Sequence, residues 1–212
     1  MTDILSLDEG YSTTRLLTQE KPQIINTPED KFETVLFLPE GENRKGEGGL
    51  RTKGYFKKSF DDKPLISIIT VVFNGEKYLE ETIQSVINQT YSNVEYIIID
   101  GGSSDGTLDI IKKYEERIDY WVSEKDRGIY DAMNKGIRLA TGDIVGILNS
   151  DDFYKSNDIL EIVVNEFINK DIDCLYGDLE YVDSKDTSKV LRYWKYKVYK
   201  DRLFENRSNP AQ

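Results

Sequence analysis

Two adjacent carboxylates, Asp151 and Asp152, follow the strand-like run of residues 143–148 after Asn149 and Ser150. After a buried strand, such a pair repels itself and loses hydration unless a positive charge neutralises it. A divalent cation with oxygen ligands provides that charge, and Mg²⁺ typically takes one or two protein carboxylates together with substrate phosphates. The alternative is an aspartate pair that only caps the next helix. The pair is therefore a candidate metal site.

A glycine-rich turn over residues 100–106 begins with Asp100. A carboxylate at the end of the second strand commonly meets a ribose or a base, and glycine lets the backbone approach a ligand closely. In the alternative interpretation, Ser103, Ser104 and Asp105 merely cap the next helix. The G-x-G-x-x-G and G-x-x-x-x-G-K-[ST] motifs are absent, which disfavours an NAD site and a P-loop.

Three basic stretches have two interpretations each. Lys125 and Arg127, in the loop 124–128, could meet a diphosphate or form an exposed charged loop. The aromatic and basic tract 192–197 could face a membrane, stack on a sugar or form a partly exposed strand. Residues 43–60 contain six basic residues against one acidic residue. They form either an arm that contacts phosphates, a membrane or a partner, or a solvated glycine-rich linker, which we favour.

Composition excludes several classes of function. The chain of 212 residues has no histidine, which excludes Ser-His-Asp and Cys-His catalysis and histidine metal sites. The single cysteine, Cys174, excludes a disulfide framework, and we expect it to be a small buried hydrophobe. A net charge of −11 argues against nucleic-acid binding. We expect neither a membrane-spanning helix nor a secretory signal.

Strand and helix patterns alternate from residue 65 onward. Buried strands are predicted at residues 65–73, 94–99, 118–122, 143–148 and 172–176, with helices between them, and Asn74 is expected to cap the first helix. We also expect a short strand at 34–38 and extended structure over 177–199. The alternation predicts an α/β fold with a Rossmann-like, doubly wound, mostly parallel sheet and helices on both faces. Ligands bind such sheets beyond the carboxyl ends of the strands, which would gather Phe73, Asp100 and the pair Asp151 and Asp152 on one rim.

Four segments then carry a family resemblance: SIITVVFNGEKYLEETIQSVINQTY, IIIDGGSSDGT, EKDRGIYDAMNKGIRLATGD and ILNSDD. In this order, over roughly residues 64–155, they resemble the family 2 glycosyltransferases, which have the GT-A fold. The variant with GIYDAMNKGI looks most like enzymes that assemble bacterial capsule, exopolysaccharide or lipopolysaccharide sugars.

The resemblance implies a nucleoside-diphosphate sugar as donor, with a UDP-sugar expected, and Mg²⁺ or Mn²⁺ as cofactor. It also implies inversion at the anomeric carbon and a glycan or lipid-linked acceptor. Asp152 matches the metal ligand, and Asp151 matches its neighbour near the ribose or donor sugar. Phe73 matches an aromatic position against the nucleobase, Asp100 reaches the nucleoside and Arg127 approaches the pyrophosphate.

The chain also departs from the family pattern. Asn149 stands where many members have an aspartate, and Gly101 replaces the second aspartate of the pair that begins with Asp100. Inverting transfer needs a general base, which the resemblance places well beyond the metal motif. The late carboxylates Asp178, Glu180 and Asp183 carry no recognisable motif, and we expect the acceptor half to be shortened or missing.

The sequence thus predicts a metal-dependent inverting glycosyltransferase for surface polysaccharide synthesis. The alternatives are a catalytically deficient nucleotide-sugar-binding module that lacks the acceptor half, and a nucleotidyltransferase. We expect an N-terminal extension over 1–63, a nucleotide-sugar-binding GT-A domain over 64–183 and a shortened acceptor-side tail over 184–212. We expect a cytoplasmic location, with a peripheral contact at the inner face of the membrane also considered.

Overall fold

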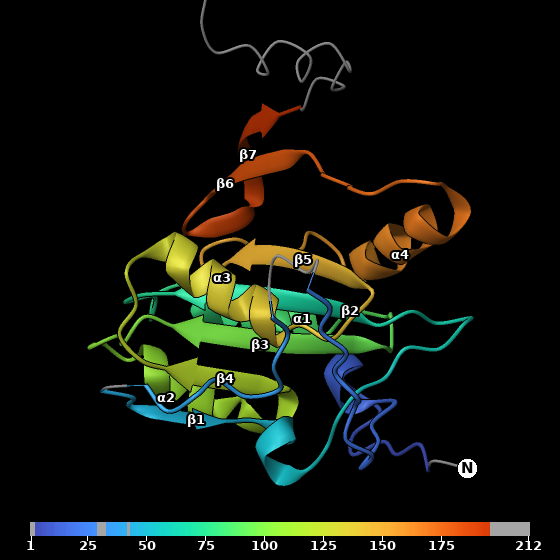
Figure 1. The fold of residues 1–212 in the computed structure, drawn as a ribbon. Coiled ribbons are helices and arrows are strands. Elements are labelled where there is room, and N and C mark those ends of the chain that lie inside the picture. Colours follow the sequence, from blue (N-terminus) through green and yellow to red (C-terminus); the bar gives the residue numbers. More distant parts are fainter. Residues whose placement is uncertain (1–2, 29–32, 42, 196–212) are drawn as a thin grey trace, which may run out of the picture. The chain divides into compact units, whose positions relative to one another are not determined.

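A computed structural model describes residues 3–28, 33–41 and 43–195, and the chain divides into two compact units, Met1–Asn169 and Lys170–Gln212. The first unit contains a five-stranded sheet and the second a two-stranded sheet (Figure 1). The described N-terminal residues belong to the first unit, because they contribute a strand to its sheet.

The strand order in the five-stranded sheet is β1-β4-β3-β2-β5. Four strands are parallel, β2 (Ile66–Val72), β3 (Val94–Asp100), β4 (Tyr120–Ser123) and β5 (Ile144–Asn149), and β1 (Gly46–Gly48) is antiparallel to β4. Every residue of β2 and β3 is buried, as their continuous apolar runs predict. The winding reverses at β2, because β3 and β4 lie on one side of it and β5 on the other.

Helices cover both faces of this sheet. One apolar cluster joins the sheet to α1 (Leu79–Ile87), α2 (Thr107–Lys113) and α4 (Ile159–Asn169), and a second joins its other face to α3 (Ile129–Leu139). Gly136 lets α3 pack closely on β2, because a Cβ there would lie 2.3 Å from Cγ2 of Ile69. These layers confirm the predicted doubly wound, mostly parallel architecture.

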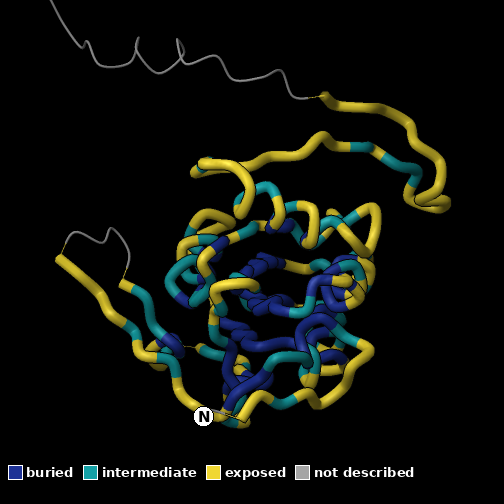
Figure 2. Tube along the Cα trace, turned by 90° about the vertical axis from the view of Figure 1, so that its right-hand side faces the viewer, coloured by how far each residue is buried: buried dark blue, intermediate teal, exposed yellow. Residues whose placement is uncertain are grey.

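The N-terminal segment, by which we mean the described residues before β2, packs along this sheet. The Oγ atoms of Ser12 and Thr13, in the 3-10 helix η1 (Ser12–Thr14), donate hydrogen bonds to carbonyl groups that precede β3 and β4. Arg51, in the 3-10 helix η2 (Leu50–Lys53), and Lys57 are buried, at 3% and 2% exposure. The interpretation of residues 43–60 as a solvated linker was therefore wrong. Figure 2 shows the most buried part of the trace in the sheet and its immediate neighbours.

A buried ion pair attaches this segment to β3. Nη2 of Arg51 lies 2.5 Å from Oε1 of Glu95, and its guanidinium also donates to the carbonyl groups of Leu36 and Leu139. Burial alone would raise the pKa of Glu95, but Arg51 and hydrogen bonds from Ser67 and Thr141 hold it below its usual value. A charged group is tolerated here because its partners replace the lost water.

Four local predictions were wrong. Residues 34–38 form no strand, although Leu36 and Leu38 are buried, and residues 172–176 form no strand because their apolar side chains stay largely exposed. Cys174 is exposed rather than buried. Asn74 does not cap α1, which begins at Leu79. The second unit instead has one hairpin, β6 (Leu179–Asp183) and β7 (Asp186–Trp194), in the predicted extended region.

A short 3-10 helix, η3 (Glu115–Arg117), completes the elements between α2 and β4. Among the described residues, no helix is both long enough and apolar enough to cross a bilayer.

Candidate functional site

The loops that follow β2, β3, β4 and β5 leave the sheet at the same edge. Val72 pairs with Asp100, and Asp100 pairs with Ser123, while Val71 pairs with Asn149 on the other side. Figure 1 shows the arrowheads of these parallel strands at one end of the sheet. The rim, as we call this edge, therefore holds all five residues predicted to bind metal or nucleotide sugar: Phe73, Asp100, Arg127, Asp151 and Asp152.

Four of the five side chains are exposed on the rim, and Asp100 is fully buried. Phe73 is 66% exposed directly after β2. The winding reverses between the carboxyl ends of β2 and β5. Open doubly wound sheets bind their ligands at such a point.

Hydrogen bonds fasten the loop after β2 to the turn after β3. The backbone N–H of Asn74 donates to Oγ of Ser103 over 2.7 Å, and the N–H of Ser104 donates to Oδ1 of Asn74 over 2.9 Å. The N–H of Gly75 and Oγ1 of Thr107 are 2.8 Å apart. Asn74 has a left-handed backbone with φ of 52°, which asparagine tolerates better than most residues. These bonds give the rim a fixed shape before any ligand binds.

Asp100, the buried last residue of β3, holds this turn in place through its carboxylate. Its carboxylate accepts hydrogen bonds from the backbone N–H of Ser103 at 3.2 and 3.1 Å, from Oγ of Ser103, and from Oγ of Ser123 at 2.5 Å. Its exposure is 0%. Asp100 is therefore a positioning residue in this structure, and its predicted contact with the nucleoside stays a prediction.

Sequence reasoning missed a lysine at the rim. Nζ of Lys45 donates to the carbonyl oxygens of Gly102 and Ser103, both at 2.8 Å. Lys45 precedes β1, and since β1 runs antiparallel to β4, its first residue pairs with Ser123 at the rim. The excess of basic residues over 43–60 was the available signal, but nothing in the sequence indicated which lysine would reach the turn.

Beside Lys45, Glu124 links two further cations. Nη2 of Arg44 and Nζ of Lys135 each lie 2.8 Å from its carboxylate. Burial would raise the pKa of Glu124, but hydrogen bonds from Lys135 and Arg44 outweigh this effect and lower it. Glu124 therefore stays ionised and ties the N-terminal segment to α3.

The candidate metal loop is held to α1. Oγ1 of Thr82 lies 2.9 and 2.8 Å from the carbonyl oxygens of Ser150 and Asp152, and Nδ2 of Asn149 donates to Oδ2 of Asp152 over 3.0 Å. Within the described ranges, no three carboxylate, cysteine or histidine side chains gather as a ready-made metal site. Two exposed carboxylates fit Mg²⁺ or Mn²⁺ when substrate phosphates supply further oxygens.

The loop after β4 carries the predicted pyrophosphate contact. Arg127 is exposed, and its backbone N–H donates to Oδ2 of Asp131 over 3.1 Å. Oδ1 of Asp126 accepts from the N–H of Gly128 over 2.8 Å, and Gly128 immediately precedes α3. These two hydrogen bonds fix the backbone of the loop that carries Arg127.

The general-base candidates Asp178 and Asp183 lie in the second unit, in and beside the hairpin. Their role stays a prediction, as does that of Glu180.

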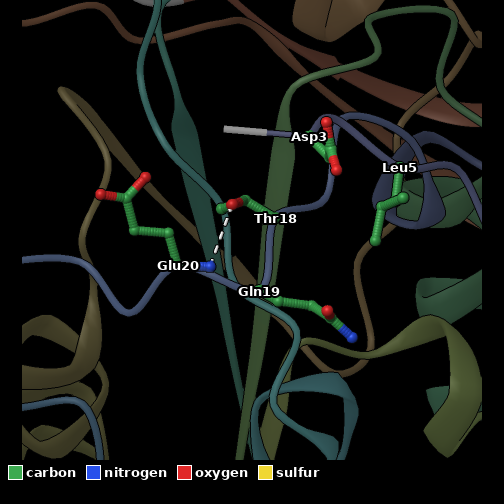
Figure 3. Close-up of a pocket in the computed structure, with 5 residues that line it drawn as sticks. All are labelled: Asp3, Leu5, Thr18, Gln19 and Glu20. Carbon is green, nitrogen blue, oxygen red and sulfur yellow. Dashed lines mark hydrogen bonds between the residues drawn. The ribbon is translucent and has the colours of Figure 1, made fainter. Parts of the chain in front are cut away.

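A pocket elsewhere contains none of the predicted site residues. It has a volume of about 240 Å³ and is lined by five residues, which Figure 3 labels: Asp3, Leu5, Thr18, Gln19 and Glu20. The dashed line in Figure 3 is the 3.1 Å hydrogen bond from the N–H of Glu20 to Oγ1 of Thr18. Ser12 and Thr13, between the two halves of this lining, bond to the carbonyl groups of Val86 and Arg117, which precede β3 and β4. The pocket therefore lies near the amino ends of the strands, away from the rim.

A family model described as glycosyl transferase family 2 matches residues 67–211. The chain belongs to glycosyl transferase family 2. It is similar to a putative teichuronic acid biosynthesis glycosyltransferase of Bacillus subtilis, with 42% identity over 45% of this chain and 39% of that protein. It is also similar to an uncharacterized glycosyltransferase of Rickettsia felis, with 38% identity over 62% of this chain and 22% of that protein. The chain spans less than half the length of these relatives.

Two solved structures match about half of this chain. The mannosyltransferase PcManGT from Pyrobaculum calidifontis, in complex with GDP-Man and Mn²⁺, is 28% identical, with a TM-score of 0.46 over 48% of this chain and 32% of that one. TarS of S. aureus, in complex with UDP-GlcNAc, is 26% identical, with a TM-score of 0.44 over 50% and 31%. The family membership and the observed sheet confirm the GT-A fold and the predicted resemblance to the family 2 glycosyltransferases.

Proposed function

We propose that the rim binds a nucleoside-diphosphate sugar together with Mg²⁺ or Mn²⁺. The expected donor is a UDP-sugar, transferred with inversion to a glycan or lipid-linked acceptor. The observation that supports this most directly is the exposure of Phe73, Asp151 and Asp152 after the carboxyl ends of β2 and β5. Family membership supplies the reaction class.

Each exposed side chain has a role that suits its chemistry. Phe73 offers an aromatic surface to the base, and Arg127 offers a cation to the pyrophosphate. Asp151 meets the ribose or donor sugar, and Asp152 holds the cation. When bound, the cation would neutralise charge on the leaving diphosphate. Asp100 and Lys45 fix the turn against which the nucleoside lies.

The transfer itself needs a group that accepts a proton. The acceptor hydroxyl oxygen forms a bond to the anomeric carbon as the bond from that carbon to the diphosphate oxygen breaks, and the hydroxyl proton passes to a carboxylate. Asp178 and Asp183 are the candidates for that carboxylate. The Bacillus subtilis relative is named for teichuronic acid biosynthesis, which supports a surface polysaccharide as the product.

The test is calorimetry of UDP binding with and without Mn²⁺, using Asp152→Ala. We expect wild-type protein to bind UDP more tightly with Mn²⁺ than without it. In the variant, this increase in UDP affinity should be smaller by a factor of at least about ten, since the cation contributes several kcal/mol to phosphate stabilisation. Asp109→Ala, an exposed aspartate on α2, is the matched control. The same Mn²⁺ dependence in Asp152→Ala would mean that Asp152 does not hold the cation; a helix-cap role is already excluded, because α4 begins only at Ile159.

A further inference from the structure

The carboxylate of Asp126 fills the space that a side chain at position 101 would need. A Cβ built on Gly101 would lie 2.6 Å from Oδ2 of Asp126 and 3.2 Å from its Cγ. Any residue but glycine at 101 would therefore displace this carboxylate. Position 101 follows β3, whereas Asp126 comes from the loop after the neighbouring strand β4. The fold thus delivers an acidic group to position 101 from a different strand.

This carboxylate shares a face of the sheet with Phe73. Val71 and Ile99 both pack in the cluster on the α3 face, and because side chains alternate along a strand, positions 73 and 101 face the same way. Val72 pairs with Asp100, which places these two positions next to each other. An exposed aromatic ring and a carboxylate therefore border the same part of the rim.

The hydrogen-bonding capacity of Asp126 limits what it can recognise. Its Oδ1 accepts from the N–H of Gly128, which leaves Oδ2 facing Gly101. An ionised carboxylate accepts hydrogen bonds and cannot donate them. Uracil and guanine present a ring N–H to such a group, whereas the corresponding ring nitrogen of cytosine or adenine is itself an acceptor.

We propose that Asp126 selects the base of the nucleotide-sugar donor, favouring bases with a ring N–H over those with an acceptor at that position. This inference rests on the proposed function, because it assigns the nucleoside to the rim. It makes Asp126 a specificity-determining residue, while Gly101 is required by its close approach.

The experiment compares two pairs of ligands that differ in the hydrogen-bonding edge while sharing ring size: UDP with CDP, and GDP with ADP. Calorimetry in Mn²⁺ should give wild-type protein at least about tenfold tighter binding of UDP than of CDP, the range for a hydrogen bond to a charged group. Whichever purine binds, GDP should bind more tightly than ADP.

Asp126→Asn is the decisive variant, because its Oδ1 can still accept from Gly128 while its amide donates in place of Oδ2. We expect the preference for UDP over CDP to fall about tenfold or more, with an unchanged melting temperature. Asp131→Asn, with the same chemical change in the first turn of α3, should keep the wild-type preference.

The outcomes separate this inference from the proposed function. If wild-type protein binds CDP as tightly as UDP, or if Asp126→Asn keeps the wild-type ratio, Asp126 does not read the base, although Mn²⁺-dependent nucleotide binding stands. If Asp131→Asn changes the ratio as much as Asp126→Asn, the effect belongs to the charge of the loop and the inference is wrong. If wild-type protein binds none of the four nucleotides in Mn²⁺, the proposed function fails, and this inference fails with it.

Discussion

Lys45 should control nucleotide affinity although it lies outside the residues that the family model matches. Lys45→Met keeps most of the aliphatic stem and removes the ammonium group that holds the carbonyl oxygens of Gly102 and Ser103. Without this ammonium group, the turn loses two of the hydrogen bonds that fix it, while the carboxylate of Asp100 still accepts hydrogen bonds from Ser103. The turn should loosen without unfolding the sheet.

The magnitude follows from the exposure of the lysine. A hydrogen bond from a charged group contributes about 1.5–3 kcal/mol when shielded from water. Lys45 is exposed, so we expect a smaller contribution of about 1 kcal/mol, as for exposed ion pairs. This corresponds to roughly fivefold weaker UDP binding, since about 1.4 kcal/mol is a factor of ten.

Calorimetry of UDP in Mn²⁺ measures this effect, with Lys53→Met as the matched control. Lys53 belongs to the same N-terminal segment and pairs with Glu115 and Glu116, in η3 before β4. We expect Lys45→Met to weaken binding and Lys53→Met to leave it within twofold. Equal effects, or no effect of Lys45→Met, would refute the reasoning that the N-terminal segment shapes the donor site.

Two further predictions concern the buried charges under the N-terminal segment. Arg51→Met should lower the free energy of unfolding by about 3–5 kcal/mol in denaturant titrations, because it leaves the buried Glu95 carboxylate without its cation; a loss below about 1 kcal/mol would mean that water replaces the guanidinium. Burial raises the pKa of Asp119 to about 7, against the attraction of Lys57, so between about pH 4 and 7 the unfolded chain loses a proton that the folded protein keeps. Asp119 therefore lowers the free energy of unfolding as pH rises. Between pH 5 and pH 7, the free energy of unfolding of Asp119→Asn relative to wild type should increase by at least about 1.4 kcal/mol, the equivalent of one pKa unit. Parallel stability curves of the two proteins would contradict the raised pKa of Asp119.

The sequence predicted β2, β3 and β4 because their burial is continuous. The expectation that residues 143–148 are buried was wrong in part, since Val145 and Ile147 of β5 are each 46% exposed. Residues 66–72 and 94–100 are largely apolar on both faces of the strand. This pattern is typical of strands in a parallel sheet that is covered by helices on both sides. The prediction of a strand at 34–38 was wrong because apolar residues can be buried without strand pairing. Val35 donates to the carbonyl of Arg138, and Leu36 and Leu38 are buried beside it, but no strand forms there.

The candidate site was predictable only where it lies in the strand-end loops. Phe73, Asp151 and Asp152 follow strands directly, so the topology alone assigns them to the rim. Asp126 and Lys45 could not be assigned this way. The approach of Asp126 to Gly101 depends on the path of a loop, and the reach of Lys45 depends on β1 being added antiparallel to β4.

That antiparallel strand explains how the N-terminal segment comes to influence the rim. A segment added parallel to β4 would begin at the amino ends of the strands, away from the rim. Because β1 runs the other way, Lys45 enters at the rim and Arg51 leaves at the opposite end, where it meets Glu95. The segment also covers the edge of β4, which would otherwise be open to pairing with another chain. One short strand thus protects the sheet edge and fixes the turn that we expect to hold the nucleoside.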